Sequence, residues 1–370
     1  MKKKMKKAFT LVELLVVIAI LAVLSTVAIV GYNSFTEKAQ KSADQQAVTQ
    51  MNNVVEAAGV LENIETGADA YEAIIENGYD GGFKTAYGAY SMAWLAEEKA
   101  VVLVTQEAVA FPEEYAGTSL DKVSPLYTVE ADTQEKLVDA LAGKGSNYVN
   151  VNISKEITTT TADLTINKNV TAVINLEDNI STSYQYGKIS NYGDLTVNGN
   201  GNQIITINNF DGGRVVVNDA IVGYEDSKIQ SVRNRSGEMI LNNCTLANSS
   251  PYYDGAPMFA YVAICNQGKL VLNNCTYEGV THGVFSSSAL IEINGGSYKL
   301  ENGSSAHMFY GTGVFDVNGG TFTVENTNGY MCCDEDTTGG LFLDTPTGTF
   351  NLRGENLTLD TKGVVGIGNK

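Results

Sequence analysis

Three consecutive carboxylates, Asp334, Glu335 and Asp336, form the densest acidic cluster of this 370-residue chain. Paired carboxylates cleave glycosidic bonds in hydrolases, and carboxylate oxygens are the ligands that calcium prefers. Such sites also use a nearby cation, but the nearest Arg, Arg353, lies far along the chain, and a TTGG segment follows the cluster directly. We therefore predict a solvated loop here, and we expect no catalytic residue, no bound metal and no cofactor.

Cysteine and histidine are too sparse for a strong zinc signature, because the chain holds five Cys, two His and no CxxC pair. Cys244 and Cys275 occupy the same place in two copies of a repeated segment, NNCTL and NNCTY. If these copies stack as neighbouring strands, the two residues lie about 4.8 Å apart, a separation that a disulfide accepts. The sequence leaves two interpretations open, a disulfide or a ladder of two buried thiols.

The segment PYYDGAPMFAY at 251–261 gathers four aromatic residues, Tyr252, Tyr253, Phe259 and Tyr261, between two strand-like stretches. Exposed tyrosines on a rigid scaffold can stack on sugars or dock a protein partner. The alternative is that these rings only pack against the side of the scaffold. Because binding residues concentrate on long loops, we predict a binding loop here, for a glycan or another host-surface ligand.

An ionisable residue, Glu13, lies within a long apolar run that begins at Phe9 and ends near residue 31. A helix of about 23 residues is about 34 Å long, enough to cross a bilayer. Five Lys precede the run, which predicts a cytoplasmic N-terminus. A carboxylate in a membrane helix is costly and indicates a function with a specific partner.

The segment KKAFTLVELLVVIAILAVL resembles the N-terminal signal of type IV pilins and pseudopilins. The resemblance implies that a prepilin peptidase cleaves between Ala8 and Phe9 and methylates Phe9. It also implies that Glu13 pairs with the amino group of Phe9 on a neighbouring subunit and so sets the register of assembly. Two positions differ from the usual family pattern, Ala8 in place of Gly and Val30 in place of Pro. The alternative is a plain signal anchor with Glu13 at the membrane interface.

Beyond the apolar run, small and apolar residues that include Phe35 and Met51 recur every three or four positions up to Leu61, whereas Glu37, Lys41 and Asp44 lie on the other face. This spacing is typical of an amphipathic helix, so 9–61 is predicted to be one helix, with 9–31 as the membrane or filament core. The segments that follow predict a short helix at 69–77 and a hairpin at 90–106 that buries Trp94.

From about residue 163 the chain repeats a unit of alternating apolar residues followed by Asn, with the Asn at 167, 198, 218, 242, 273, 294 and 318. Recurring units of 20 to 31 residues are typical of stacked coils with variable loops. Asn and Gly suit the corners of such coils because both tolerate positive φ. The repeats are similar to those of right-handed parallel β-helices found in bacterial surface proteins and polysaccharide-acting enzymes.

The predicted fold class is thus a long N-terminal α-helix with a small α+β pilin head, followed by an all-β right-handed parallel β-helix, or solenoid. The predicted domains are a leader peptide at 1–8, the helix at 9–61, the head at 62–110, a linker at 111–125, and the β-helix with an N-terminal capping helix at 126–370.

The predicted function is a structural subunit, a major or minor pilin, of an extracellular type IV pilus-like filament that displays the β-helix for adhesion. Expected partners are the prepilin peptidase, other pilin subunits, the inner-membrane assembly platform and a glycan or host-surface ligand. The protein would lie in the cytoplasmic membrane before assembly and at the cell surface afterwards. A net charge of −18 with four Arg argues against nucleic-acid binding. The alternatives are a pseudopilin of a secretion or DNA-uptake machine and a membrane-tethered polysaccharide lyase or hydrolase, although no enzyme activity is expected.

Overall fold

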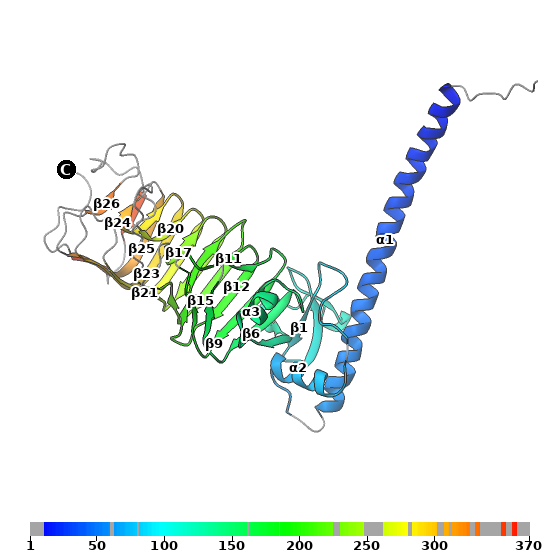
Figure 1. The fold of residues 1–370 in the computed structure, drawn as a ribbon, viewed down its shortest axis with the longest axis horizontal. Helices are drawn as coiled ribbons and strands as arrows, with labels where there is room; N and C mark the ends of the chain where they lie inside the picture. Colours follow the sequence, from blue (N-terminus) through cyan, green and yellow to red (C-terminus); the bar gives the residue numbers. More distant parts are fainter. Residues whose placement is uncertain are drawn as a thin grey trace, which may run out of the picture.

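The computed structural model describes residues 11–59, 63–79, 81–160, 163–184, 186–224, 230–247, 262–279, 283–301, 307–310, 313–325, 330–333, 349–352 and 357–360. Figure 1 shows a long helix and an elongated stack of strands that leave a small head domain in different directions. The predicted fold class, an N-terminal helix and small head followed by a parallel β-solenoid, is confirmed.

The head combines two helices with a four-stranded antiparallel sheet in the order β3-β2-β1-β4. Its elements are α1 (Leu11–Ala58), α2 (Gly67–Glu76), β1 (Ser91–Leu95), β2 (Ala100–Val104), β3 (Val109–Phe111), the 3-10 helices η1 (Glu113–Tyr115) and η2 (Leu120–Lys122), and β4 (Val123–Pro125). Residues 111–125, predicted as a linker, thus contain part of β3 and all of β4. Because β4 pairs with the central strand β1, this segment belongs to the sheet of the head.

The second half of α1 packs on one face of this sheet through Val48, Met51 and Val55, beside the fully buried Trp94 of β1. The buried stripe of the helix is rotated from the predicted one. Phe35, predicted to lie on the apolar face, is 72% exposed, whereas Asp44, predicted to be on the polar face, is 3% exposed. The periodicity was sound, but a buried acidic side chain with backbone partners cannot be recognised from hydropathy.

The solenoid begins directly after the head with β5 (Tyr127–Glu130) and the capping helix α3 (Gln134–Leu141). Thr133 caps α3 by accepting a hydrogen bond from the backbone N–H of Lys136, and Leu137 and Leu141 are buried against the first coil. This helix therefore covers the open end of the apolar core, as the sequence predicted.

The first face of the solenoid is a parallel stack that starts on β5. Its strands are β6 (Tyr148–Ile153), β9 (Thr171–Leu176), β12 (Asp194–Asn198), β15 (Arg214–Asn218), β18 (Glu238–Asn242), the first halves of β21 (Lys269–Gly279), β23 (Leu290–Glu301) and β25 (Val314–Glu325), and β27 (Thr349–Leu352).

The second and third faces are also parallel stacks. The second face holds β7 (Ile157–Thr159), β10 (Ile180–Thr182), β13 (Gln203–Ile204), β16 (Ile221–Val222), β19 (Thr245–Leu246), the second halves of β21, β23 and β25, and β28 (Leu357–Asp360). The third face holds β8 (Leu164–Ile166), β11 (Lys188–Asn191), β14 (Thr206–Asn209), β17 (Val232–Asn234), β20 (Val262–Asn266), β22 (Gly283–Ser287), β24 (His307–Tyr310) and β26 (Tyr330–Cys333).

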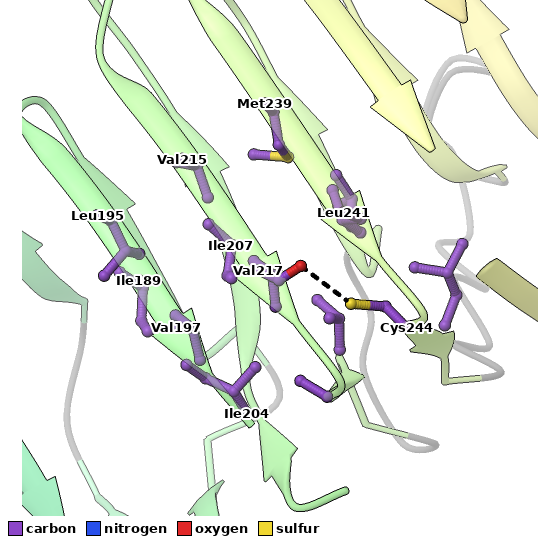
Figure 2. Close-up of a cluster of buried hydrophobic side chains, with 14 of the residues drawn as sticks. Ile189, Leu195, Val197, Ile204, Ile207, Val215, Val217, Met239, Leu241 and Cys244 are labelled. Atoms are coloured by element: carbon purple, nitrogen blue, oxygen red, sulfur yellow. Dashed lines mark hydrogen bonds between the residues drawn. The ribbon is translucent and has the colours of Figure 1, made fainter. Parts of the chain in front are cut away.

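The strands pair in register, so equivalent residues of successive coils lie above one another. On the first face Leu195, Val215 and Met239 form one inward column, and Val197, Val217 and Leu241 form the next. All six are at most 1% exposed, and Figure 2 shows them pointing into the same interior. Alternation with outward residues follows the two-residue period of a strand, which is the pattern that the repeats predicted.

Two asparagine ladders run along the solenoid. The inner ladder joins Asn191, Asn209, Asn234 and Asn266, each 0% exposed, by side-chain hydrogen bonds of 2.8, 3.1 and 2.9 Å, and ends on the hydroxyl of Ser287. The outer ladder is mostly half-buried and runs from Asn175 to Asn318 through bonds of 2.7 to 3.1 Å; it contains the repeat asparagines from Asn198 onward, whereas Asn167 donates to the carbonyl of Ala142 instead. Amides of the inner ladder donate to the following coil, whereas amides of the outer ladder donate to the preceding coil.

The residue after four of the outer-ladder asparagines adopts a left-handed backbone conformation. Asp219, Asn243 and Asn274 have φ values of 51°, 52° and 52°, and Gly295 has a φ of 94°. Positive φ suits residues that tolerate it, which is why Asn, Asp or Gly turns the chain at these four corners. The predicted corner chemistry is confirmed.

We expect Asn234→Ala to destabilise the solenoid by about 2 to 4 kcal/mol, because the buried Asn209 amide loses its acceptor and Asn266 loses its donor. Asn242→Ala, in the half-exposed outer ladder, should cost about 1 kcal/mol because water can replace the lost partner. Urea denaturation of the full chain in detergent, followed by far-UV circular dichroism, measures both values. Equal midpoints for the two variants would contradict the assignment of the inner ladder as the stronger constraint.

Candidate functional site

The first half of α1 projects away from both the head and the solenoid (Figure 1). Its apolar side chains are unusually exposed for such residues: Leu14, Leu15, Ile18, Ile20 and Leu21 are each 53% to 61% exposed. Exposure on successive residues means that the helix is apolar all round in this stretch. A contiguous exposed apolar surface marks a segment that acts in contact with other molecules.

Glu13, predicted to act in assembly, is in the first turn of α1, in one continuous helix with the exposed apolar stretch. Ala8 and Phe9, predicted to flank the processing site, lie outside the described residues, as does the side chain of Glu13.

Residues 3–29 match the family model described as the prokaryotic N-terminal methylation motif. The chain carries a type IV prepilin signal. The chain as a whole matches no curated protein and no solved structure. The matched residues include Ala8, Phe9 and Glu13, so the resemblance noted in the sequence is confirmed for the signal itself, which supports a type IV pilin-like or pseudopilin-like protein.

The prepilin signal implies processing by a prepilin peptidase and assembly with other pilins. It also fits insertion into a membrane followed by transfer to a surface filament. Within the residues that the structure describes, none of the helices has both the length and the hydropathy needed to cross a membrane.

Polar side chains of α1 attach the pilin-like helix to its head. The Asp44 carboxylate accepts hydrogen bonds from the backbone N–H groups of Ala86 and Tyr87, at 2.7 and 2.9 Å. About two turns further along the helix, the Asn52 side chain donates to the carbonyl of Val101 at 2.9 Å and accepts from the N–H of Val101 at 2.7 Å. These contacts join residues more than 40 positions apart, so they fix the rotation of α1 on the sheet.

We expect Asp44→Ala to lower the stability of the head by about 2 to 4 kcal/mol, because two backbone donors lose a charged acceptor in a buried site. Fluorescence of Trp94, the single Trp of the chain, reports unfolding of the head in urea. Glu37→Ala is the control on the same helix, since the exposed Glu37 carboxylate pairs with Lys41 one turn further on, and it should change the midpoint little. A similar shift in both variants would mean that general helix propensity, not the Asp44 contact, is measured.

Cys244 and Cys275 lie at equivalent positions of neighbouring coils, as predicted. Both are free and buried in the structure. Their thiols donate to backbone carbonyls, Cys244 to Val217 at 3.5 Å, drawn in Figure 2, and Cys275 to Leu241 at 3.4 Å. A hydrogen bond with Cys244 and burial raise the pKa of the Cys275 thiol, which keeps it protonated and unreactive.

Free thiols at these positions predict a defined labelling pattern. Native protein should resist iodoacetamide at Cys244 and Cys275 because both side chains are buried. In urea without reductant, both should become alkylated, and peptide mass spectrometry reads each site. Peptides joined through Cys244 and Cys275 that react only after reduction would show instead that a disulfide forms.

Other predicted sites lie outside the described residues. These are the aromatic loop with Tyr252, Tyr253, Phe259 and Tyr261, and the acidic cluster Asp334, Glu335 and Asp336. Among the residues that the structure does describe, no group of three or more His, Cys, Asp or Glu is arranged to hold a metal ion.

The structure also brings together a surface that was not predicted. A groove of about 1050 Å³ runs along the second face and is lined by residues of several successive coils, including Gln203, Thr245, Thr276 and Ser297. Its signal is present in the repeats, where a hydroxyl residue follows each corner in NNCTL, NNCTY, NGGSY and NGGTF. The functional meaning of these hydroxyls depends on stacking, which the individual repeats do not show.

Proposed function

We propose that this protein is a structural subunit of a type IV pilus-like extracellular filament, in which α1 forms the assembly element and the solenoid is displayed for binding to a surface. The observation that carries the proposal is the prepilin signal at 3–29, continuous with an exposed apolar helix and followed by a large folded domain. Secretion and DNA-uptake pseudopilins share this signal, and they are the first alternative.

The size and rigidity of the solenoid favour a displayed filament subunit over a pseudopilin. A solenoid joined tightly to the head suits presentation of a binding surface outside the cell. Abundance of the protein in sheared surface filaments supports the pilus assignment, and its retention in the cell envelope supports the pseudopilin.

We also propose that the displayed domain has no enzymatic activity. In the groove of the second face the lining side chains include one carboxylate, Glu278, and its partner at 3.2 Å is the ammonium group of Lys299. Glycoside hydrolysis uses two carboxylates on either side of the bond. Release of reducing ends from polysaccharide by the full chain, lost on Asp334→Ala, would favour the membrane-tethered lyase or hydrolase instead.

Processing predicts a mature protein that begins at Phe9 with a methylated amino group. Intact mass and N-terminal peptide mass spectrometry of protein from the native host check this directly. The Ala8→Asp variant should keep its leader, because the peptidase requires a small residue before the cut, while Ala8→Gly should be processed normally. A wild-type protein that retains Met1 would contradict the assignment.

Assembly predicts a specific loss for Glu13. Glu13→Val should insert and be processed as before, since the change makes the apolar run longer. Sheared filaments should fall at least tenfold, because the subunit has lost the charge that pairs with the amino group of Phe9. Thr10→Val, which alters a neighbouring residue without removing a charge, is the control. Normal filament yield from the Glu13 variant would contradict the proposed role.

A further inference from the structure

The groove on the second face is built from one column of outward side chains. Pairing in register places these five residues at the same position of five successive coils: Gln203, Ile221, Thr245, Thr276 and Ser297. Successive members are about 4.8 Å apart, the spacing between hydrogen-bonded strands. The column therefore presents outward side chains at a constant interval over about 19 Å, and its last three members, Thr245, Thr276 and Ser297, form a row of hydroxyls.

The hydroxyl groups of the column retain hydrogen-bonding capacity. Thr245 and Thr276 are exposed, and their hydroxyls lie 3.1 Å apart. A hydroxyl donates one hydrogen bond and accepts two, so one contact between neighbours leaves each group able to bind a ligand. Ser297 is exposed in the next coil and extends the same row.

Apolar surface lies beside the hydroxyl row. Ile221 is 37% exposed in the column and lines the groove. Tyr224 also lines the groove, and its hydroxyl donates to the backbone carbonyl of Tyr184 at 2.9 Å, which fixes the position of the Tyr224 ring. An aromatic ring and a branched aliphatic side chain next to hydroxyls match a sugar, which has apolar C–H faces and polar edges.

The charge of the groove favours a neutral ligand. The charged groups that line it, Glu278 and Lys299, form an ion pair with each other at 3.2 Å. The chain as a whole carries a net charge of −18, which repels polyanions. An anionic polysaccharide or a nucleic acid would therefore meet no unpaired cation among these lining residues.

We propose that the groove of the second face binds an uncharged polysaccharide, with the sugar chain lying along the solenoid axis. This proposal rests on the display function of the solenoid and names its ligand class. The hydroxyl row contacts successive sugars, Ile221 and Tyr224 contact their apolar faces, and the Glu278–Lys299 pair lines one side. Binding occurs without cleavage because the carboxylate of Glu278 has no second carboxylate opposite it in the lining.

The test is affinity electrophoresis of the purified full chain in a detergent without a sugar headgroup. Native gels are cast with dextran, mannan, galactan or xylan, and with polygalacturonate as the charged comparison. At least one neutral polysaccharide should retard the protein. The double variant Thr245→Val and Thr276→Val should raise the dissociation constant for that polysaccharide about tenfold or more. Tyr224→Ala should weaken binding similarly, whereas Tyr224→Phe should retain most of it because the ring remains.

The matched control is Thr196→Val, the same change on the outward side of the first face. It should bind like the unmodified chain, and circular dichroism should show that every variant is folded. Absence of retardation by all four neutral polysaccharides, retardation by polygalacturonate alone, or equal loss in the Thr196 variant would each overturn the proposal. Filament yield in the native host is scored separately, so failure of the groove and failure of the pilus assignment give different results.

Discussion

Parallel stacking in register is the constraint on which the rest of the molecule depends. Each coil supplies backbone hydrogen-bond partners to its neighbour. A polar side chain that points inward needs a hydrogen-bond partner of its own, and the neighbouring coil along the axis can provide it. The inner ladder from Asn191 to Asn266 satisfies this requirement by repeating one amide at one corner, so that each copy supplies the next. A shift of one residue in any strand would place apolar columns outside and break this ladder. Register, corner conformation and apolar core are therefore set together.

The same repetition produces the candidate binding surface. Packing in the core restricts the type of residue that faces inward. The core also sets the positions of the outward residues on the second face, but it does not restrict their type. Hydroxyls at Thr245, Thr276 and Ser297 thus form a row because the corners and inner columns are in register. Spacing along the row is that of the sheet, which gives a repeating surface suited to a repeating polymer.

Much of this architecture could be predicted from the sequence, for reasons that differ between regions. The prepilin signal depends on consecutive residues and was recognised directly, and the stacked coils were predicted because Asn recurs with corner residues such as Asn243 and Asn274. Asp44 was misplaced on the polar face because its partners, the amides of Ala86 and Tyr87, lie about 40 residues away. The groove was not anticipated for the same reason, since it combines single side chains from coils 18 to 31 residues apart.

The connection between the head and the solenoid has a mechanical consequence. Strand β4 ends at Pro125 and β5 begins at Tyr127, with the fully buried Leu126 between them. The ring of Tyr127 packs against Tyr71 and Phe83 of the head, and Lys84 donates to the carbonyl of Gly143 beside the first coil. Without slack at this joint, the solenoid behaves as an arm of fixed direction on α1. In a helical filament of identical subunits, each solenoid would point in an equivalent direction around the fibre. Many grooves of low affinity could then bind one surface together and share a pulling force.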